Sequence, residues 1–94
     1  MREKEIGCQV LRIKKMEMLF DLVTKTLHSR PDELQSVSIR EAVQTLSDYY
    51  GNGDWLQDYE LDEQRMLPPD LKRGVLSQDG LYDLLSVIKD ITAK

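Results

Sequence analysis

The sequence predicts an all-α protein, and three observations carry this prediction. Apolar residues recur every three or four positions over long stretches, which is the spacing of a helix that is buried on one side. Glycine and proline interrupt these stretches at only a few places. No segment shows the alternation of apolar and polar residues that is typical of a half-buried strand. We therefore expect a long antiparallel helical hairpin, a short helix, an irregular Pro/Gly segment and a C-terminal helix.

The first helix is expected to run from residue 3 to residue 28. One apolar stripe follows the helical spacing: Ile6, Val10, Ile13, Met16, Phe20, Val23 and Leu27. A second apolar set falls on the opposite side of the helix: Cys8, Leu11, Met18, Leu19 and Leu22. A helix that is apolar on two sides needs two neighbours. One neighbour is the second helix, and the other is either the C-terminal helix or another copy of the chain, so a homo-oligomer through this helix is one alternative.

The second helix follows Pro31, because proline cannot continue a helix but suits the first turn of a new one. We expect it to begin near residue 31 and to end near residue 50, since that length matches the first helix. An alternative start lies near residue 39, because Ser38 and Glu41 have the spacing of a capping box. The residues expected to be buried are Ile39, Ala42, Val43, Leu46, Tyr49 and Tyr50.

A short third helix should follow the Gly-Asn-Gly sequence of residues 51–53, because glycine and asparagine favour the end of a helix. Asp54 is expected to cap the third helix. The sequence Leu67-Pro68-Pro69 should end it, since two consecutive prolines exclude regular helix. The residues expected on its inner face are Trp55, Leu56 and Tyr59.

The last helix is expected to begin after Ser77, a residue type that commonly caps helices. Before it, residues 69–73 should form a single turn that Gly74 closes. The buried stripe of this helix is predicted to consist of Leu81, Leu84, Leu85, Ile88 and Ile91.

The length of 94 residues predicts one domain, residues 1–94, with the hairpin in residues 1–50 and an aromatic-centred subdomain in residues 51–94. The only cysteine, Cys8, excludes an internal disulfide. The N-terminal residues lack the apolar stretch of a secretion signal. No stretch approaches the roughly 20 apolar residues that cross a bilayer. We therefore expect a cytoplasmic protein that makes no contact with a membrane.

The charges of the chain are unevenly distributed. Residues 1–30 carry seven basic and four acidic side chains, whereas residues 31–63 carry one basic and nine acidic ones. One interpretation is that a basic first helix lies beside acidic segments of the same chain. The other is that the acidic stretch faces a basic partner. A clustered basic footprint is missing, so the sequence argues against nucleic-acid binding.

Residues 49–85 carry a long pattern of turn-forming, aromatic and charged residues. Its elements are Tyr49, Tyr50, Gly53, Trp55, Asp58, Glu60, Asp62, Glu63, Pro68, the run DLKRGVLS of residues 70–77, the run DGLY of residues 79–82, Leu84 and Leu85. In this pattern the chain resembles a small bacterial family known only as a domain of unknown function. Two departures are Arg65, where a glycine is expected, and Gln78, where an acid is expected. The resemblance implies a short α-helical bacterial protein and brings no activity or site residue with it.

A row of carboxylates lies on the expected third helix. Asp54, Asp58 and Asp62 are four residues apart, which places them near one helical face. Carboxylate oxygens are the ligands that Ca²⁺ and Mg²⁺ prefer, so a divalent-cation site is one hypothesis. The sequence lacks the Asp- and Gly-rich calcium loop, however. We therefore expect the three acids to lie on a solvated face and to form ion pairs with Lys72, Arg73 or the basic first helix.

The aromatic residues and the basic pair each allow two interpretations. Trp55 with the tyrosines could form a binding cleft, but clustered aromatics at helical spacing are more often core. Trp55 could still reach the surface as a contact residue. Lys72 and Arg73 could bind an acidic partner, and we favour pairing with residues 58–63 of the same chain instead.

The histidine and the cysteine cannot act together. Cys8 and His28 are 20 residues apart on one expected helix, or roughly 30 Å at 1.5 Å per residue. This distance excludes a Cys-His nucleophile pair within one chain. One cysteine and one histidine are also too few ligands for zinc in a monomer.

The sequence therefore predicts a non-enzymatic protein-interaction or regulatory module with no cofactor and an unknown protein partner. The alternative is a small divalent-cation-dependent enzyme or ligand-binding protein that uses Asp54, Asp58 and Asp62. The residues of the candidate interaction surface are Leu11, Met18, Leu22, Trp55, Asp58, Asp62, Lys72 and Arg73.

Overall fold

The computed structural model describes residues 3–77 and 79–92, with side chains from Gly7 onward. Four α-helices and two 3-10 turns make up the described chain. In order they are α1 (Glu3–Ser29), η1 (Pro31–Gln35), α2 (Val37–Gly51), α3 (Asp54–Glu63), η2 (Gly74–Leu76) and α4 (Gly80–Thr92). The described residues form no strand, so the prediction of an all-α fold is confirmed.

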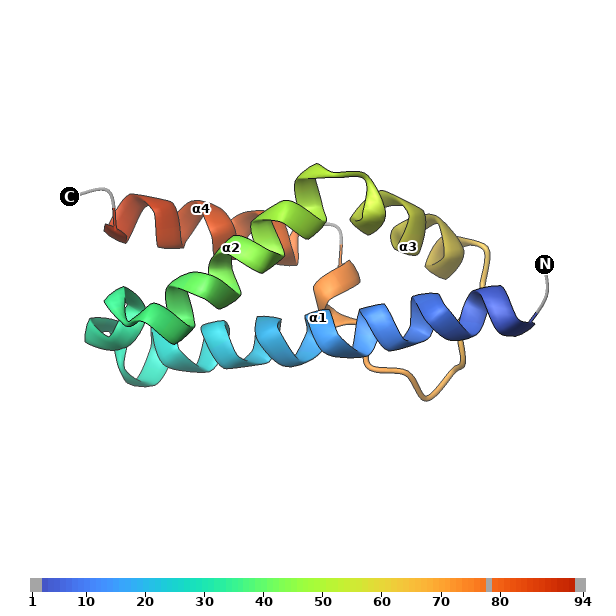
Figure 1. Ribbon diagram of the computed structural model, residues 1–94, viewed down its shortest axis with the longest axis horizontal. Coiled ribbons are helices and arrows are strands. Elements are labelled where there is room, and N and C mark those ends of the chain that lie inside the picture. The colour runs from blue at the N-terminus through green and yellow to red at the C-terminus, as the bar shows by residue number, and fades with distance from the viewer. Residues whose placement is uncertain (1–2, 78, 93–94) are drawn as a thin grey trace.

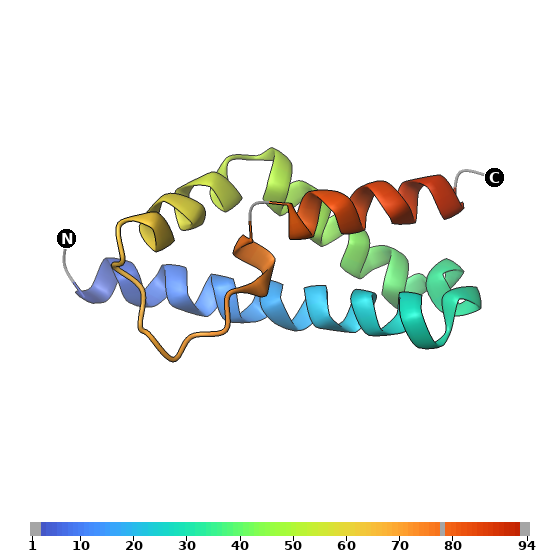
Figure 2. The same cartoon turned by 180° about the vertical axis from the view of Figure 1, so that it is seen from behind.

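Helix α1 spans most of the length of an elongated molecule that measures 45 × 19 × 18 Å (Figure 1). Helix α2 runs back over α1, and α3 continues toward the N-terminal end of α1. Helix α4 lies beside α2 and runs in the opposite direction. The segment between α3 and η2 passes across the near side of α1 in the reverse view (Figure 2). All other elements therefore pack on one part of the circumference of α1.

The inner side of α1 has the predicted stripe. Ile13, Met16 and Val23 are buried, and Val10, Phe20 and Leu27 are partly buried against the same core. The side chain of Ile6, the first residue of the predicted stripe, lies outside the described residues.

The second apolar set of α1 differs from the prediction. Leu19 is partly buried, but Leu11 and Met18 are 68% and 72% exposed, Leu22 is 45% exposed, and Cys8 is also exposed. The expectation that a second helix of the same chain covers this face is therefore wrong. The physical reason is that α2, α4 and both 3-10 turns converge on the inner side, where they share one core.

The second helix begins at Val37, so the predicted start near residue 31 is wrong and the alternative near residue 39 is close. Pro31 does begin a helical turn, but this turn is the 3-10 element η1 and ends at Gln35. The extended backbone of Ser36, with φ −66° and ψ 152°, separates the two elements. Because the helix is interrupted at Ser36, the side chain of Leu34 lies in the core, where it is 1% exposed.

The residues of α2 that were predicted to be buried are confirmed. Ile39, Ala42, Leu46 and Tyr49 are buried, and Val43 and Tyr50 are partly buried against them.

Helix α3 follows Gly53, whose φ of 97° lies in the left-handed region that favours glycine. Asp54 is thus the first helical residue and Gly53 occupies the capping position. The helix ends at Glu63, before the prolines. Arg65 has a φ of 58°, which explains why glycine would suit this position.

The inner face of α3 is formed by Trp55, Asp58 and Leu61, with Tyr59 partly buried. Leu56 is exposed, so its predicted burial is wrong. A helix that packs on one side buries residues three or four positions apart, and Leu56 falls outside the stripe that begins at Trp55.

Helix α4 begins at Gly80, three residues after Ser77. Ser77 instead closes η2, where its backbone N–H donates to the carbonyl of Gly74. Gly74 begins η2 rather than closing a turn of residues 69–73. The predicted stripe of α4 is buried at Leu81, Leu84 and Ile88 and partly buried at Leu85, whereas Ile91 is exposed.

One continuous hydrophobic cluster joins all six elements. Within the described part of the chain, no helix combines the length and the apolarity that crossing a membrane requires.

Candidate functional site

The carboxylate of Asp58 lies at the junction of three helices and is fully buried. Arg12 of α1 donates two hydrogen bonds to it, from Nε to Oδ2 at 3.0 Å and from Nη2 to Oδ1 at 2.6 Å. The hydroxyl of Tyr49 in α2 donates a third, to Oδ2 at 2.6 Å. We call these three residues the Asp58 cluster. It joins α1, α2 and α3 through side chains.

The Asp58 cluster satisfies a charge that would otherwise be costly to bury. The hydrogen bond to Asp58 raises the pKa of Arg12 above its ordinary value. Burial, followed by the hydrogen bond to Asp58, raises the pKa of Tyr49 well above its ordinary value. Arg12 therefore stays charged and Tyr49 stays protonated at neutral pH. This arrangement holds its protons firmly, which suits a structural contact better than proton transfer.

The carboxylate row faces guanidinium groups. Asp54 lies 3.4 Å from Nη1 of Arg12, and Asp62 accepts a hydrogen bond of 2.5 Å from Nη1 of Arg73. The predicted pairing of the row with helix α1 and with Arg73 is thus confirmed. The expectation that all three acids are solvated is wrong for Asp58, because α3 turns that residue toward the core. Within the described residues, no three potential metal ligands converge.

The two basic residues Lys72 and Arg73 contact different helices. Arg73 contacts Asp62 and also donates to the carbonyl of Pro68 at 2.9 Å, so it ties α3 to the segment after it. Lys72 contacts Asp21 of α1 instead, at 3.0 Å, and not residues 58–63 as predicted. This hydrogen bond raises the pKa of Lys72.

Glu17 has a structural contact that sequence reasoning missed. It is buried, and its Oε1 accepts a hydrogen bond from the backbone N–H of Val75 at 2.8 Å. A Cβ added at Gly74 would lie 3.2 Å from Oε2 of Glu17, so the glycine allows the close approach. The available signal was the position of Glu17, next to Met16 and within the buried stripe of α1.

The aromatic cluster is mainly core. Trp55 donates from Nε1 to the carbonyl of Val75 at 2.9 Å, and its ring is stacked on Tyr59 at 5.0 Å between centroids. Tyr50 lies 5.2 Å from Trp55 and 6.3 Å from Tyr82, whose side chain is exposed. The predicted contact residues Trp55 and Asp58 are both buried. Neither belongs to an exposed surface, because both face the inner side of α3.

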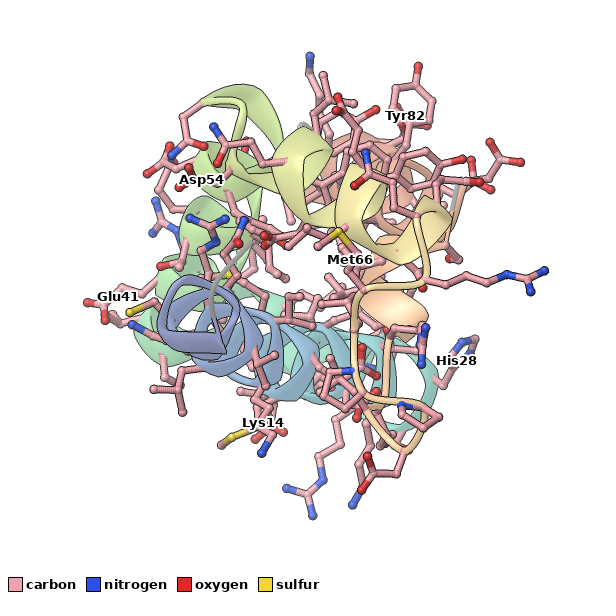
Figure 3. All side chains as sticks on the ribbon, turned by 90° about the vertical axis from the view of Figure 1, so that its right-hand side faces the viewer. Lys14, His28, Glu41, Asp54, Met66 and Tyr82 are labelled. Carbon is pink, nitrogen blue, oxygen red and sulfur yellow. The ribbon has the colours of Figure 1, made fainter. Side chains whose placement is uncertain are left out.

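The remaining predicted contact residues of α1 do share one surface. Leu11, Met18 and Leu22 lie within about 40° of one another at 100° per residue, and together we call them the outer face of α1. Three exposed lysines accompany this row on the same side: Lys14, Lys15 and Lys25. In Figure 3, Lys14 points away from the body of the molecule. The outer face thus has apolar residues in its middle and lysines at its edges, and Asp21, which pairs with Lys72, lies on the same edge as Lys14.

A groove of about 530 Å³ adjoins this face, between α1 and the segment that crosses it. The residues that line one side of the groove are Val10, Lys14, Glu17, Met18 and Asp21, and those that line the other are Pro68, Asp70, Leu71 and Lys72. Asp62 and Arg73 do not line it, so the structure separates these two predicted contact residues from the outer face.

The comparisons with known proteins identify the family. The chain matches the family described as a domain of unknown function (DUF4298) over residues 13–94, and it belongs to that family. The match includes most of α1, well beyond the residues 49–85 on which the resemblance was based. No curated protein and no solved structure matches the chain.

Proposed function

We propose that this member of the DUF4298 family is a non-enzymatic protein-interaction module that binds an acidic partner protein through the outer face of α1. The observation that carries the proposal is the exposure of Leu11 and Met18, at 68% and 72%, in the middle of a helix of 27 residues. Contiguous exposed apolar residues with a polar rim are typical of protein-binding surfaces. We expect the module to act in the cytoplasm.

The non-enzymatic part of the proposal rests on how the charged side chains are used. Asp58 is taken by Arg12 and Tyr49, Asp62 by Arg73, and Glu17 by the backbone of Val75. Each of these contacts joins two segments of the chain. Cys8 and His28, which could act as nucleophile and base, are both exposed and lie at different ends of α1. The acidic side chains that could act in catalysis thus hold the fold together, and the cysteine and the histidine lie too far apart to act on one substrate.

The same contacts oppose the alternative of a divalent-cation enzyme. A cation at the carboxylate row would have to displace the guanidinium groups of Arg12 and Arg73. Millimolar Mg²⁺, Mn²⁺ or Ca²⁺ should therefore leave the melting temperature unchanged. A rise in melting temperature that Asp58→Asn abolishes would restore the enzyme hypothesis.

The charge of the outer face selects the kind of partner. Lys14, Lys15 and Lys25 are exposed, and each lies within about one helical turn of Leu11, Met18 or Leu22. A second copy that offers the same face would bring two sets of lysines together, and such like-charge contacts are unfavourable. A partner with carboxylates around an apolar centre is complementary in both respects.

Affinity purification from the native host tests this proposal. Three tagged forms are compared: wild type, Leu11→Gln/Met18→Gln/Leu22→Gln, and the control Val37→Gln/Leu56→Gln/Val87→Gln, in which three other exposed apolar residues are changed. A specific partner should co-purify with the wild type and the control and be lost with the α1 variant. Recovery of the same proteins with all three forms would refute a role for the outer face.

Self-association is distinguished by sedimentation of the purified protein. The proposal expects a monomer for the wild type and for Leu11→Glu/Leu22→Glu. A wild-type dimer that the double substitution converts to a monomer would show that the occupant of the outer face is a second copy.

A further inference from the structure

A second surface, separate from the outer face of α1, is a groove of about 580 Å³ between α2 and α4. Each helix contributes residues with the same spacing of three, four, seven and ten positions. The contributing residues are Arg40, Val43, Gln44, Ser47 and Tyr50 of α2, and Tyr82, Leu85, Ser86, Lys89 and Thr92 of α4. The buried residues Leu34 and Ile88 complete the apolar base of the groove.

The two ends of this groove differ in chemistry. Helices α2 and α4 run in opposite directions (Figures 1 and 2), so the end of α2 meets the beginning of α4. Tyr50 and Tyr82 accordingly lie together, 6.3 Å between ring centroids. Arg40, near the beginning of α2, and Lys89, near the end of α4, belong to the opposite half. The groove has an aromatic end and a basic end, and its middle has an apolar base with polar side chains at the rim, namely Gln44, Ser47 and Ser86.

The basic end of the groove has no carboxylate among its lining residues. The chain has a net charge of −4, yet the residues that line this groove include Arg40 and Lys89 and no acid. Among the contacts of the described residues, neither Arg40 nor Lys89 forms an ion pair, whereas Arg12, Arg73 and Lys72 all do. Two exposed cations that flank a groove with an apolar base are complementary to a ligand with carboxylates beside apolar side chains.

We propose that this groove binds an amphipathic helix of a partner protein, with the carboxylates of that helix near Arg40 and Lys89. From residue 82 to residue 92 of α4 the groove extends about 15 Å, which matches roughly three turns of a bound helix. Two helices with matching rows of side chains form the kind of groove that accepts a third helix. The C-terminal end of the bound helix lies at the basic end, because its dipole is negative there. Its apolar residues contact the apolar base and the two tyrosines.

The groove and the outer face of α1 can be occupied independently. Figure 3 shows Tyr82 pointing away from the molecule on one side and Lys14 pointing away on the opposite side. The groove proposal therefore stands or falls without the proposed role of α1.

NMR titration of the ¹⁵N-labelled chain with designed peptides tests the proposal. Three helical peptides of about 14 residues, or four turns, share leucines at positions i, i+3, i+4 and i+7. They differ only in the last turn, which carries glutamate, glutamine or lysine. The glutamate peptide should give saturable shifts in residues 40–50 and 82–92, the glutamine peptide should bind more weakly, and the lysine peptide should bind least.

Charge reversal supplies the specific variant and its control. The double substitution Arg40→Glu/Lys89→Glu should lower the affinity for the glutamate peptide by roughly tenfold, since two exposed charge pairs become repulsive. Arg30→Glu/Arg65→Glu changes the net charge by the same amount outside both proposed surfaces and should leave the affinity unchanged. The melting temperatures of both variants should match that of the wild type, because all four side chains are exposed.

The outcomes that would overturn the proposal are equally definite. They are the absence of saturable shifts in residues 40–50 and 82–92 with the glutamate peptide, shifts confined to the outer face of α1, and equal losses in the two charge-reversed variants. A spin label at the C-terminus of the peptide should broaden the amide signals of Arg40 and Lys89. Broadening at Tyr50 and Tyr82 instead would refute the proposed orientation.

Discussion

The two sides of α1 each contain residues of the kind that usually lies on the other side: charged side chains in buried contacts on the inner side, and large apolar side chains exposed on the outer side. Leu11 and Arg12 are neighbours in the sequence, yet the leucine is 68% exposed and the arginine contacts a fully buried carboxylate. Glu17 is buried, whereas the next residue, Met18, is 72% exposed. Buried charges require nearly complete pairing, and exposed apolar rows indicate a missing contact. The inner side of α1 is therefore committed to the fold, whereas the outer side leaves Leu11, Met18 and Leu22 exposed.

The largest expected effect comes from removing the central charge of the inner side. Asp58→Ala leaves the Arg12 guanidinium and the Tyr49 hydroxyl without their acceptor, which should lower the free energy of unfolding by about 3–5 kcal/mol. Urea unfolding followed by Trp55 fluorescence measures this loss. The control is Asp54→Ala, whose longer contact with Arg12 is partly exposed and should cost at most about 1 kcal/mol. Equal losses in the two variants would show that the Asp58 cluster contributes little.

The second prediction concerns the other buried charge of α1. Glu17→Ala removes the acceptor of the Val75 N–H and should lower the free energy of unfolding by about 1.5–3 kcal/mol. Glu17→Gln keeps an acceptor oxygen and should recover part of this loss. Chemical denaturation of the three proteins gives the comparison. If the glutamine variant is no more stable than the alanine variant, the hydrogen bond to η2 is unimportant.

The third prediction uses the pKa of Tyr49, which burial and the hydrogen bond to Asp58 raise above the ordinary value of 10.0. In the unfolded chain this tyrosine loses its proton near that ordinary value, whereas folded Tyr49 keeps it. The folded state then binds more protons, so stability is full below pH 10 and falls as the pH rises. Relative to Tyr49→Phe, the wild type should lose up to about 1.4 kcal/mol per pH unit above pH 10. Parallel stability curves for the two proteins would contradict a buried, protonated Tyr49.

The smallest effect is expected on the outer side. Leu11→Gln/Met18→Gln/Leu22→Gln should change the free energy of unfolding of the isolated protein by no more than about 0.5 kcal/mol per site. The measurement is the same urea titration. A loss as large as that of Asp58→Ala would mean that the outer face is covered in the folded protein, and the contrast between the two sides would disappear.

Helical spacing alone predicted most of the buried residues. The stripes of α1, α2 and α4 could be found because a helix that packs on one side repeats its contacts every three or four residues. The all-α class and the end of α1 before Pro31 follow from the same local rules. Local rules also gave the ion pairs of the carboxylate row with a basic helix, although they could not select Arg12 from the several basic residues of α1.

The errors arose where local signals conflict with packing. Pro31 begins a helical turn, as its conformation requires, but burial of Leu34 made that turn a separate 3-10 element. Leucine is typical of protein cores, yet Leu56 lies on the outer side of α3. The reason is that Trp55 and Asp58 occupy the side of the helix that faces the core. Spacing could not reveal that Glu17 accepts a hydrogen bond from Val75, since the two are 58 positions apart.

Local sequence patterns suffice to find the helical segments of this protein, the apolar side of each, and the glycines and prolines between them. These properties depend on neighbours within a few residues along the chain. Packing in three dimensions determines which apolar side of α1 is covered and which carboxylate is buried. Both outcomes depend on which distant segments share the limited space along one helix, and a chain with three shorter helices can enclose only one side of α1.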